Sequence, residues 1–155
     1  MPKKPTASDA EIILKLYDLR RESEMRKARQ WMLVNFWPET IDDYLKIAQN
    51  LGAQENNWLR QVISYWGMAT SFVLNGVLSD KLFNELAFSG EMYFLFAKVK
   101  PFVKELRQRL QNPHLLANVE KVILGSKTGR EQLAMFEQRV AQRRQAMKQG
   151  AASAR

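Results

Sequence analysis

The side chains best suited to bind a ligand lie in the last third of the chain, which is strongly basic. Residues 98–155 hold 13 Lys and Arg against 4 Asp and Glu, whereas residues 1–97 hold 11 against 12. Guanidinium groups form paired hydrogen bonds with phosphate oxygens, and a local excess of positive charge steers anions. The predicted polyanion-binding residues, for nucleic acid or an anionic membrane surface, are Arg139, Arg143, Arg144 and Lys148.

The same segment carries an apolar stripe. Leu133, Phe136 and Val140 recur at i, i+3 and i+7, the spacing of one helix face, so they form a candidate contact for a partner helix. A third interpretation needs no ligand, because basic residues near the C-terminus of a helix are favoured by its dipole and are often only solvated.

Catalytic groups are scarce. The chain has no cysteine and one histidine, His114, which excludes thiolate chemistry and leaves a metal site without partners. The loop Gly125–Gly129 lacks the residue order of a phosphate-binding motif. One residue of the acidic pair Asp42–Asp43 is predicted to cap a helix. We therefore predict no catalytic, cofactor-binding or metal-binding residue, and no enzyme activity.

Aromatic residues at helical spacing form one further candidate. They either line a pocket for a flat ligand or, as such stripes do more often, fill the core. The cluster comprises Trp31, Phe36, Trp37, Trp58, Tyr65, Trp66 and Phe72.

The elements that position these residues are all predicted to be helices. A first helix begins at the capping box Ser8–Glu11 and continues until Pro38. A second begins at Thr40, with Asp43 as its reciprocal cap. A third, from Gln54 to Asn75, has the apolar segment 57–75, which we expect at the centre of the fold.

Proline and glycine divide the second half of the chain. Ser79 or Asp80 caps a short helix, and Pro101 interrupts a long one that begins at Glu91. Asn112–Pro113 is predicted to open a helix that ends at Gly125, and a capping box at Thr128–Glu131 opens the last helix.

The predicted fold is therefore an all-α, single-domain, irregular bundle of six or seven helices around the central helix at about 57–75. Residues 8–149 form the domain, and residues 1–7 and 150–155 are expected to be disordered.

The stretch Gln61–Ser79 contains no charged residue, which raises the question of a membrane span. Its serine, threonine, asparagine and glycine residues favour a buried core helix instead. No signal peptide is evident at the N-terminus, and the lack of cysteine fits a reducing compartment, so we expect a cytoplasmic protein.

Several segments carry a family resemblance. They are Leu16–Glu22, Arg26–Trp31, Asn75–Ser79 and Lys100–Phe102 followed by Arg107. Over about residues 10–124 the chain resembles a bacterial all-helical family whose domain has no assigned function. The resemblance implies a helical cytoplasmic or membrane-associated bacterial protein and supplies no catalytic residue. Some relatives carry an N-terminal membrane segment that this sequence does not show.

Two functions follow from these observations. The first is a non-catalytic interaction or structural protein that self-associates as a homodimer, through its first or last helix, or that binds an unidentified protein partner. The alternative is non-specific binding of nucleic acid or anionic membrane through the basic third, with an affinity that falls as salt rises.

Overall fold

A computed structural model describes residues 3–154, and this part of the chain contains helices and no strands. The predicted all-α fold with a single core is confirmed. The helices are α1 (Ala7–Leu19), α2 (Ser23–Val34), α3 (Ile41–Ala48), α4 (Gln54–Leu74), α5 (Asp80–Phe83), α6 (Leu86–Val99), η1 (Lys100–Phe102, 3-10), α7 (Val103–Arg109), α8 (Ala117–Leu124) and α9 (Lys127–Ser153).

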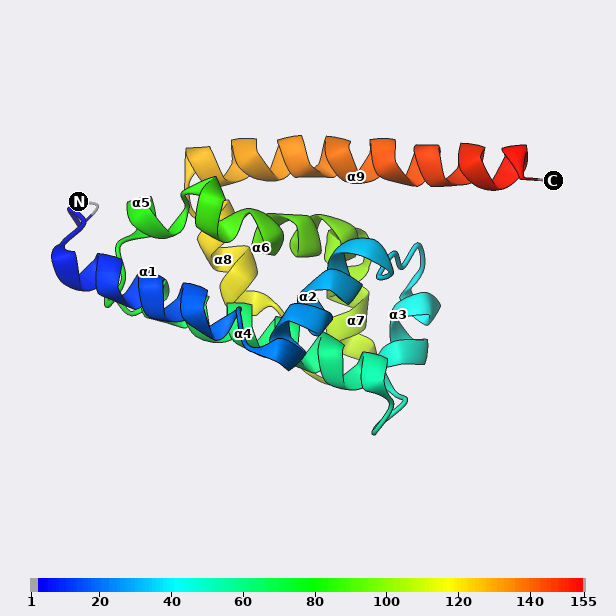
Figure 1. Cartoon of the computed structure of the whole chain (residues 1–155), viewed down its shortest axis with the longest axis horizontal. Coiled ribbons are helices and arrows are strands. Elements are labelled where there is room, and N and C mark those ends of the chain that lie inside the picture. The colour runs from blue at the N-terminus through cyan, green and yellow to red at the C-terminus, as the bar shows by residue number, and fades with distance from the viewer. Residues whose placement is uncertain (1–2, 155) are drawn as a thin grey trace.

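The helices pack in layers, with α9 along one side of the molecule (Figure 1). The first half of α9 lies on α6, and α8 passes from α9 to α4. On the opposite side, α2 packs along α4. The C-terminal end of α9 extends past the other helices, so this part of α9 has few neighbours (Figure 1).

The most deeply buried helix is α6, which the sequence pattern did not place at the centre. Its buried residues include Met92, Tyr93, Leu95 and Phe96. Helix α4 supplies Trp66 and other core residues, as predicted. It is nevertheless open to solvent along one face, because α2, α3 and α8 cover only part of its circumference.

Helix starts follow local capping, although three predicted caps are at the wrong residue. Thr40 and Asp43 form the predicted reciprocal cap of α3. The first helix is capped by Thr6 with Asp9, instead of Ser8 with Glu11. Asp9 is preferred because its carboxylate also accepts a hydrogen bond, at 2.8 Å, from the Ser79 backbone N–H across the fold.

The predicted long first helix is divided in two, which helps to explain why more helices form than the six or seven expected. The carboxylate of Glu22 accepts hydrogen bonds from the backbone N–H groups of Glu24 and Met25, and so begins a new helix. Arg20, at the end of α1, is turned into the interior at this break.

In the second half, Pro101 lies in η1 between α6 and α7, so the predicted interruption is confirmed. Helix α8 begins at Ala117 rather than near Pro113, since Leu116 takes a left-handed conformation with φ of 54°. The last helix is capped by Ser126 instead of Thr128. It continues to Ser153, through residues where disorder was expected.

None of the helices formed by residues 3–154 combines the length and the apolar character that a bilayer crossing requires.

Candidate functional site

The four basic residues predicted to bind a polyanion do not form one free patch. Arg144 donates a hydrogen bond of 2.6 Å to the Pro38 carbonyl oxygen. Lys148 lies 3.4 Å from the carboxylate of Glu39. Arg139 lies over the Phe136 ring, 5.0 Å from its centroid. Two of the four side chains therefore attach α9 to the loop that follows α2.

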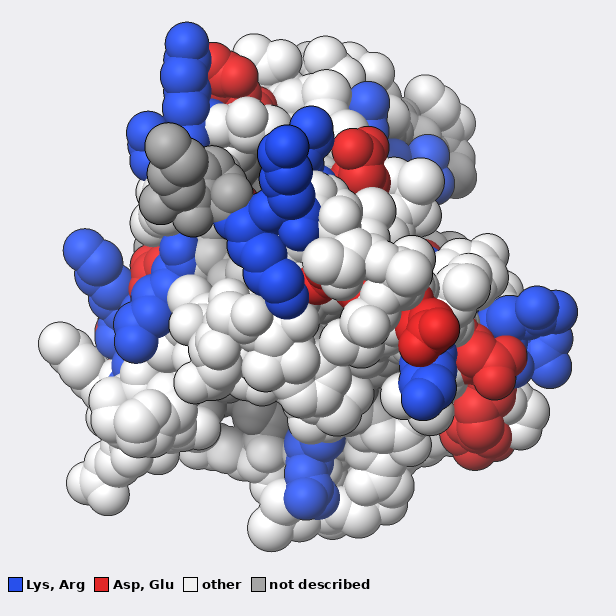
Figure 2. Space-filling model, turned by 90° about the vertical axis from the view of Figure 1, so that its left-hand side faces the viewer, with Lys and Arg blue, Asp and Glu red and all other residues white. Residues whose placement is uncertain are grey.

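The opposite end of the molecule also lacks a continuous basic surface. Where α1 and α9 begin, Lys and Arg side chains stand in several groups separated by acidic and uncharged residues (Figure 2). This distribution gives no single surface for a phosphate backbone.

The apolar stripe of α9 is used within the chain. Leu133, Phe136 and Val140 are buried in the core, where α9 packs on α6. The Phe136 ring stacks on Tyr93 at 5.8 Å between centroids. A partner could reach this stripe only if α9 left its place on the core.

The aromatic cluster belongs mainly to the core. Trp66 makes edge contacts with Tyr65, Phe83 and Phe88, and Trp31 packs on Phe36. These rings join α2, α4, α5 and α6 into one apolar centre. The indole N–H groups of Trp66 and Trp58 are both buried without a hydrogen-bond partner.

Buried polar side chains mostly hold backbone groups in place. Tyr65 donates a hydrogen bond of 2.6 Å to the Leu16 carbonyl oxygen, and Asn56 donates to the last carbonyl groups of α3. The ammonium of Lys98, fully buried, donates to the carbonyl oxygens of Met32 and Phe36 at 2.6 and 2.8 Å. Lys98 also lies over the rings of Trp37 and Phe94. Sequence reasoning missed this residue, although a single lysine within an apolar helix was a signal.

The other residues considered for chemistry are exposed or belong to a helix cap. His114 is exposed, and its neighbour Asn112 accepts its backbone N–H. In the loop Gly125–Gly129, the Ser126 hydroxyl oxygen accepts the Gly129 N–H at 2.9 Å, which makes this loop a helix cap. Among residues 3–154, no three acidic or histidine side chains are grouped so as to hold a metal ion.

The outer face of α4 is exposed and carries no charged residue over its whole length. We define the α4 face by the side chains that follow one another along this helix at spacings of three and four: Asn57, Gln61, Ser64, Met68, Ser71 and Asn75. Ser71 is half-buried and the others are exposed, yet none is charged. Soluble surfaces normally mix charges of both signs over such a length.

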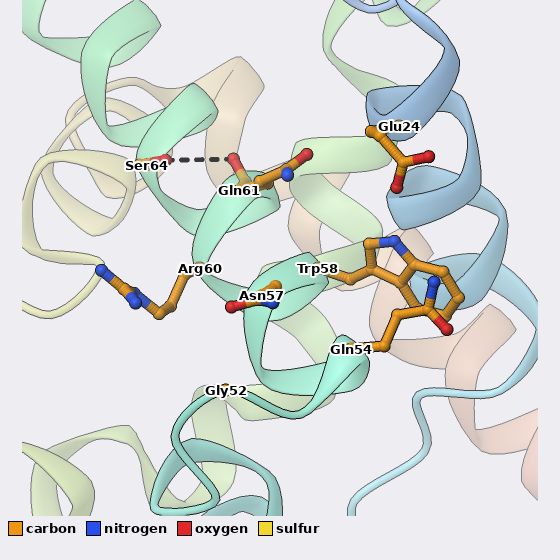
Figure 3. A pocket seen from close by; sticks show the side chains of 8 residues that line it. All are labelled: Glu24, Gly52, Gln54, Asn57, Trp58, Arg60, Gln61 and Ser64. Atoms are coloured by element: carbon orange, nitrogen blue, oxygen red, sulfur yellow. Dashed lines mark hydrogen bonds between the residues drawn. The ribbon is translucent and has the colours of Figure 1, made fainter.

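A depression of about 590 Å³ lies beside the first turns of this face. Figure 3 shows Trp58 at its side, between the carboxylate of Glu24 on α2 and the amide of Gln54. Gln61 and Ser64 line the rest of it, and Arg60 points away. The depression therefore combines uncharged polar groups and one aromatic ring with two charged residues, Glu24 and Arg60.

Comparisons with known proteins give one match. The model of a family described as Domain of unknown function (DUF4760) matches residues 5–126, which leaves all of α9 outside the match. No curated protein and no solved structure matches the chain.

Proposed function

The chain belongs to the DUF4760 family, and we propose that it is a non-catalytic helical interaction protein that self-associates through the α4 face. The observation that carries this proposal is an exposed helix face without a charged residue, on a protein with a charged-residue content of 26%. Depletion of charge is a property of the centres of protein interfaces.

The hydroxyl groups on the α4 face support the proposal, because they are already satisfied within the helix. Ser64 donates a hydrogen bond to the Gln61 carbonyl oxygen at 3.2 Å, and Ser71 donates to that of Met68 at 2.6 Å. Covering these hydroxyls with a second helix therefore leaves no lost hydrogen bond.

Gly67, next to Met68, supports close approach of a partner. A glycine inside a helix costs about 1 kcal/mol relative to alanine. A Cβ atom built on Gly67 would meet nothing within 4 Å, so packing inside the chain does not need the glycine. With Ser64 and Ser71 it forms a row of small residues that lets a second helix pack closely.

The depression in Figure 3 gives the partner a second point of contact. Trp58, Gln54 and Gln61 line it, so a partner side chain that enters the depression would meet an aromatic ring beside amide groups. The proposed contact is thus on α4, in place of the first or last helix that the sequence pattern favoured.

The non-catalytic part of the proposal rests on how ionisable groups are used. Asp9 caps α1 and holds Ser79, while Lys98 holds the end of α2. Their hydrogen-bonding capacity is directed at backbone groups, as expected of structural residues.

The test is to place charge on the α4 face. We expect the wild-type protein to be a dimer at tens of micromolar, a concentration chosen as practical, in sedimentation velocity experiments. The double variant Gln61→Glu/Ser64→Glu should weaken association at least about tenfold, because like charges would meet across a two-fold axis.

A matched control is available on α9, where Gln142 and Gln145 are exposed and have the same spacing. The variant Gln142→Glu/Gln145→Glu changes the net charge equally and should associate like the wild type. A wild-type monomer, or equal weakening in both double variants, would contradict the proposal. Circular dichroism checks that all three proteins remain folded.

A further inference from the structure

We propose that the groove between the α1–α2 break, α6 and α9 binds a small amphiphilic anion, a carboxylate or phosphate carried on an apolar body. The groove has a volume of about 440 Å³, within the range of ligand-binding pockets. Its charged lining residues are Arg20, Arg29, Glu91 and Arg139. This inference does not depend on self-association through α4.

Arg20 is the centre of the argument, because it is a buried cation without a carboxylate of its own. It is 3% exposed, and its Nη1 donates a hydrogen bond of 2.9 Å to the Phe88 carbonyl oxygen. Its Nε is buried and has no hydrogen-bond partner. Burial lowers the pKa of this guanidinium, which expresses the cost of keeping the charge there.

The carboxylate that lines the groove, that of Glu91, is already paired with Arg29. Glu91 accepts hydrogen bonds from Nε and Nη2 of Arg29, at 2.9 and 2.6 Å, in a two-pronged ion pair. Nη1 of Arg29 in turn donates to the Arg20 carbonyl oxygen, which fixes the break between α1 and α2. Three guanidinium groups and one carboxylate leave the groove with two excess positive charges.

The third guanidinium, that of Arg139, lies at the opposite wall. It sits over the Phe136 ring on α9, and its side chain is exposed. An anion between α1 and α9 would therefore meet a buried cation on one side and an exposed one on the other. Such convergence of polar groups at one end of a pocket fixes the orientation of a ligand.

The remaining walls are apolar. Leu33, Phe94 and Phe136 line the groove between the two cationic walls, and the exposed side chains of Tyr17 and Leu86 stand at its edge. A free inorganic anion would leave these surfaces unused, and an uncharged hydrocarbon would leave Arg20 unpaired. A ligand with both parts satisfies the groove completely.

The test uses decanoate as the probe, with decanol and acetate as the uncharged chain and the chainless head group. In isothermal titration calorimetry with the full chain, we expect decanoate to bind with one site per protomer. Decanol and acetate should each bind at least tenfold more weakly. Equal binding of decanol would overturn the proposal, as would no decanoate binding at millimolar concentration.

Variants identify the site. Arg139→Gln should weaken decanoate binding several-fold, while Arg143→Gln, an exposed arginine one turn along α9, should leave it unchanged. Arg20→Met should weaken it more than tenfold. Because that variant also removes the hydrogen bond to Phe88, Ala87→Trp on the exposed rim provides a second test by filling the groove. Decanoate affinity that is the same in Arg139→Gln and Ala87→Trp as in the wild type would refute the assignment.

A vesicle arm separates a free amphiphile from a membrane surface. Vesicles of phosphatidylcholine with one quarter phosphatidylglycerol should not retain the protein in flotation at moderate salt, because the groove admits one small ligand. Flotation that requires Arg20 and Arg139 would overturn the assignment to a free amphiphile.

Discussion

Replacing Lys98 with methionine is expected to lower the free energy of unfolding by about 3 kcal/mol at pH 9. The methionine side chain fills similar space but donates no hydrogen bond. The Met32 and Phe36 carbonyl oxygens would then be left buried without their donor. The Met32 carbonyl oxygen depends on Lys98 because its usual helical donor, the Phe36 N–H, donates to the Trp31 carbonyl oxygen. Urea denaturation followed by circular dichroism measures the loss.

The loss should also depend on pH. Burial, together with the nearby charge of Arg144 on α9, lowers the pKa of Lys98 to about 7, well below its ordinary value of 10.5. Between these values the unfolded chain binds more protons than the native one, so the stability that involves Lys98 rises with pH. The stability difference between the wild type and Lys98→Met should therefore widen from pH 7 to pH 10.

A nearby lysine serves as the control. Lys104 on α7 is exposed, and Lys104→Met should change stability by less than about 0.5 kcal/mol at either pH. A stability difference for Lys98→Met that stays constant with pH would show that Lys98 remains charged throughout, held by the two carbonyl oxygens and the rings of Trp37 and Phe94.

The parts of the fold that the sequence predicted are those decided within a few residues. Thr40 and Asp43 satisfy each other's backbone, and Pro101 cannot continue a helix, whatever lies around them. The start of α1 was misplaced because Asp9 also binds Ser79, 70 residues away. The break before α2 was missed because the charged run around Glu22 has an uninterrupted helical pattern.

The candidate sites were less predictable, since they depend on which face of each helix is covered. The stripe of Leu133, Phe136 and Val140 was recognised correctly as apolar, but periodicity does not reveal whether α6 or another chain covers it. The uncharged stretch from Gln61 was noticed, whereas its exposure depends on how α2 and α8 pack. Arg20 had no signal at all, because it stands among other charged residues.

A second large effect on stability is expected at Gly129, where Gly129→Ala should lower the free energy of unfolding by at least about 3 kcal/mol. A Cβ atom on Gly129 would lie 2.1 Å from the Ile123 carbonyl oxygen and 3.0 Å from the Ser126 Oγ that caps α9. Neither oxygen can move aside freely. The Ile123 carbonyl belongs to the backbone of the last turn of α8, and the Ser126 hydroxyl caps the first turn of α9. The start of α9 would have to shift away from α8.

The matched control is Gly150→Ala on the same helix, where a Cβ atom would meet nothing within 4 Å. This change should be neutral or stabilising by up to about 1 kcal/mol, because alanine favours the helix. Thermal unfolding of both variants makes the comparison. If Gly129→Ala were as stable as Gly150→Ala, the result would contradict the close approach of Gly129 on α9 to the Ile123 carbonyl oxygen on α8. If only Gly129→Ala is destabilised, the glycine in the loop that resembled a phosphate-binding sequence is explained by helix packing alone.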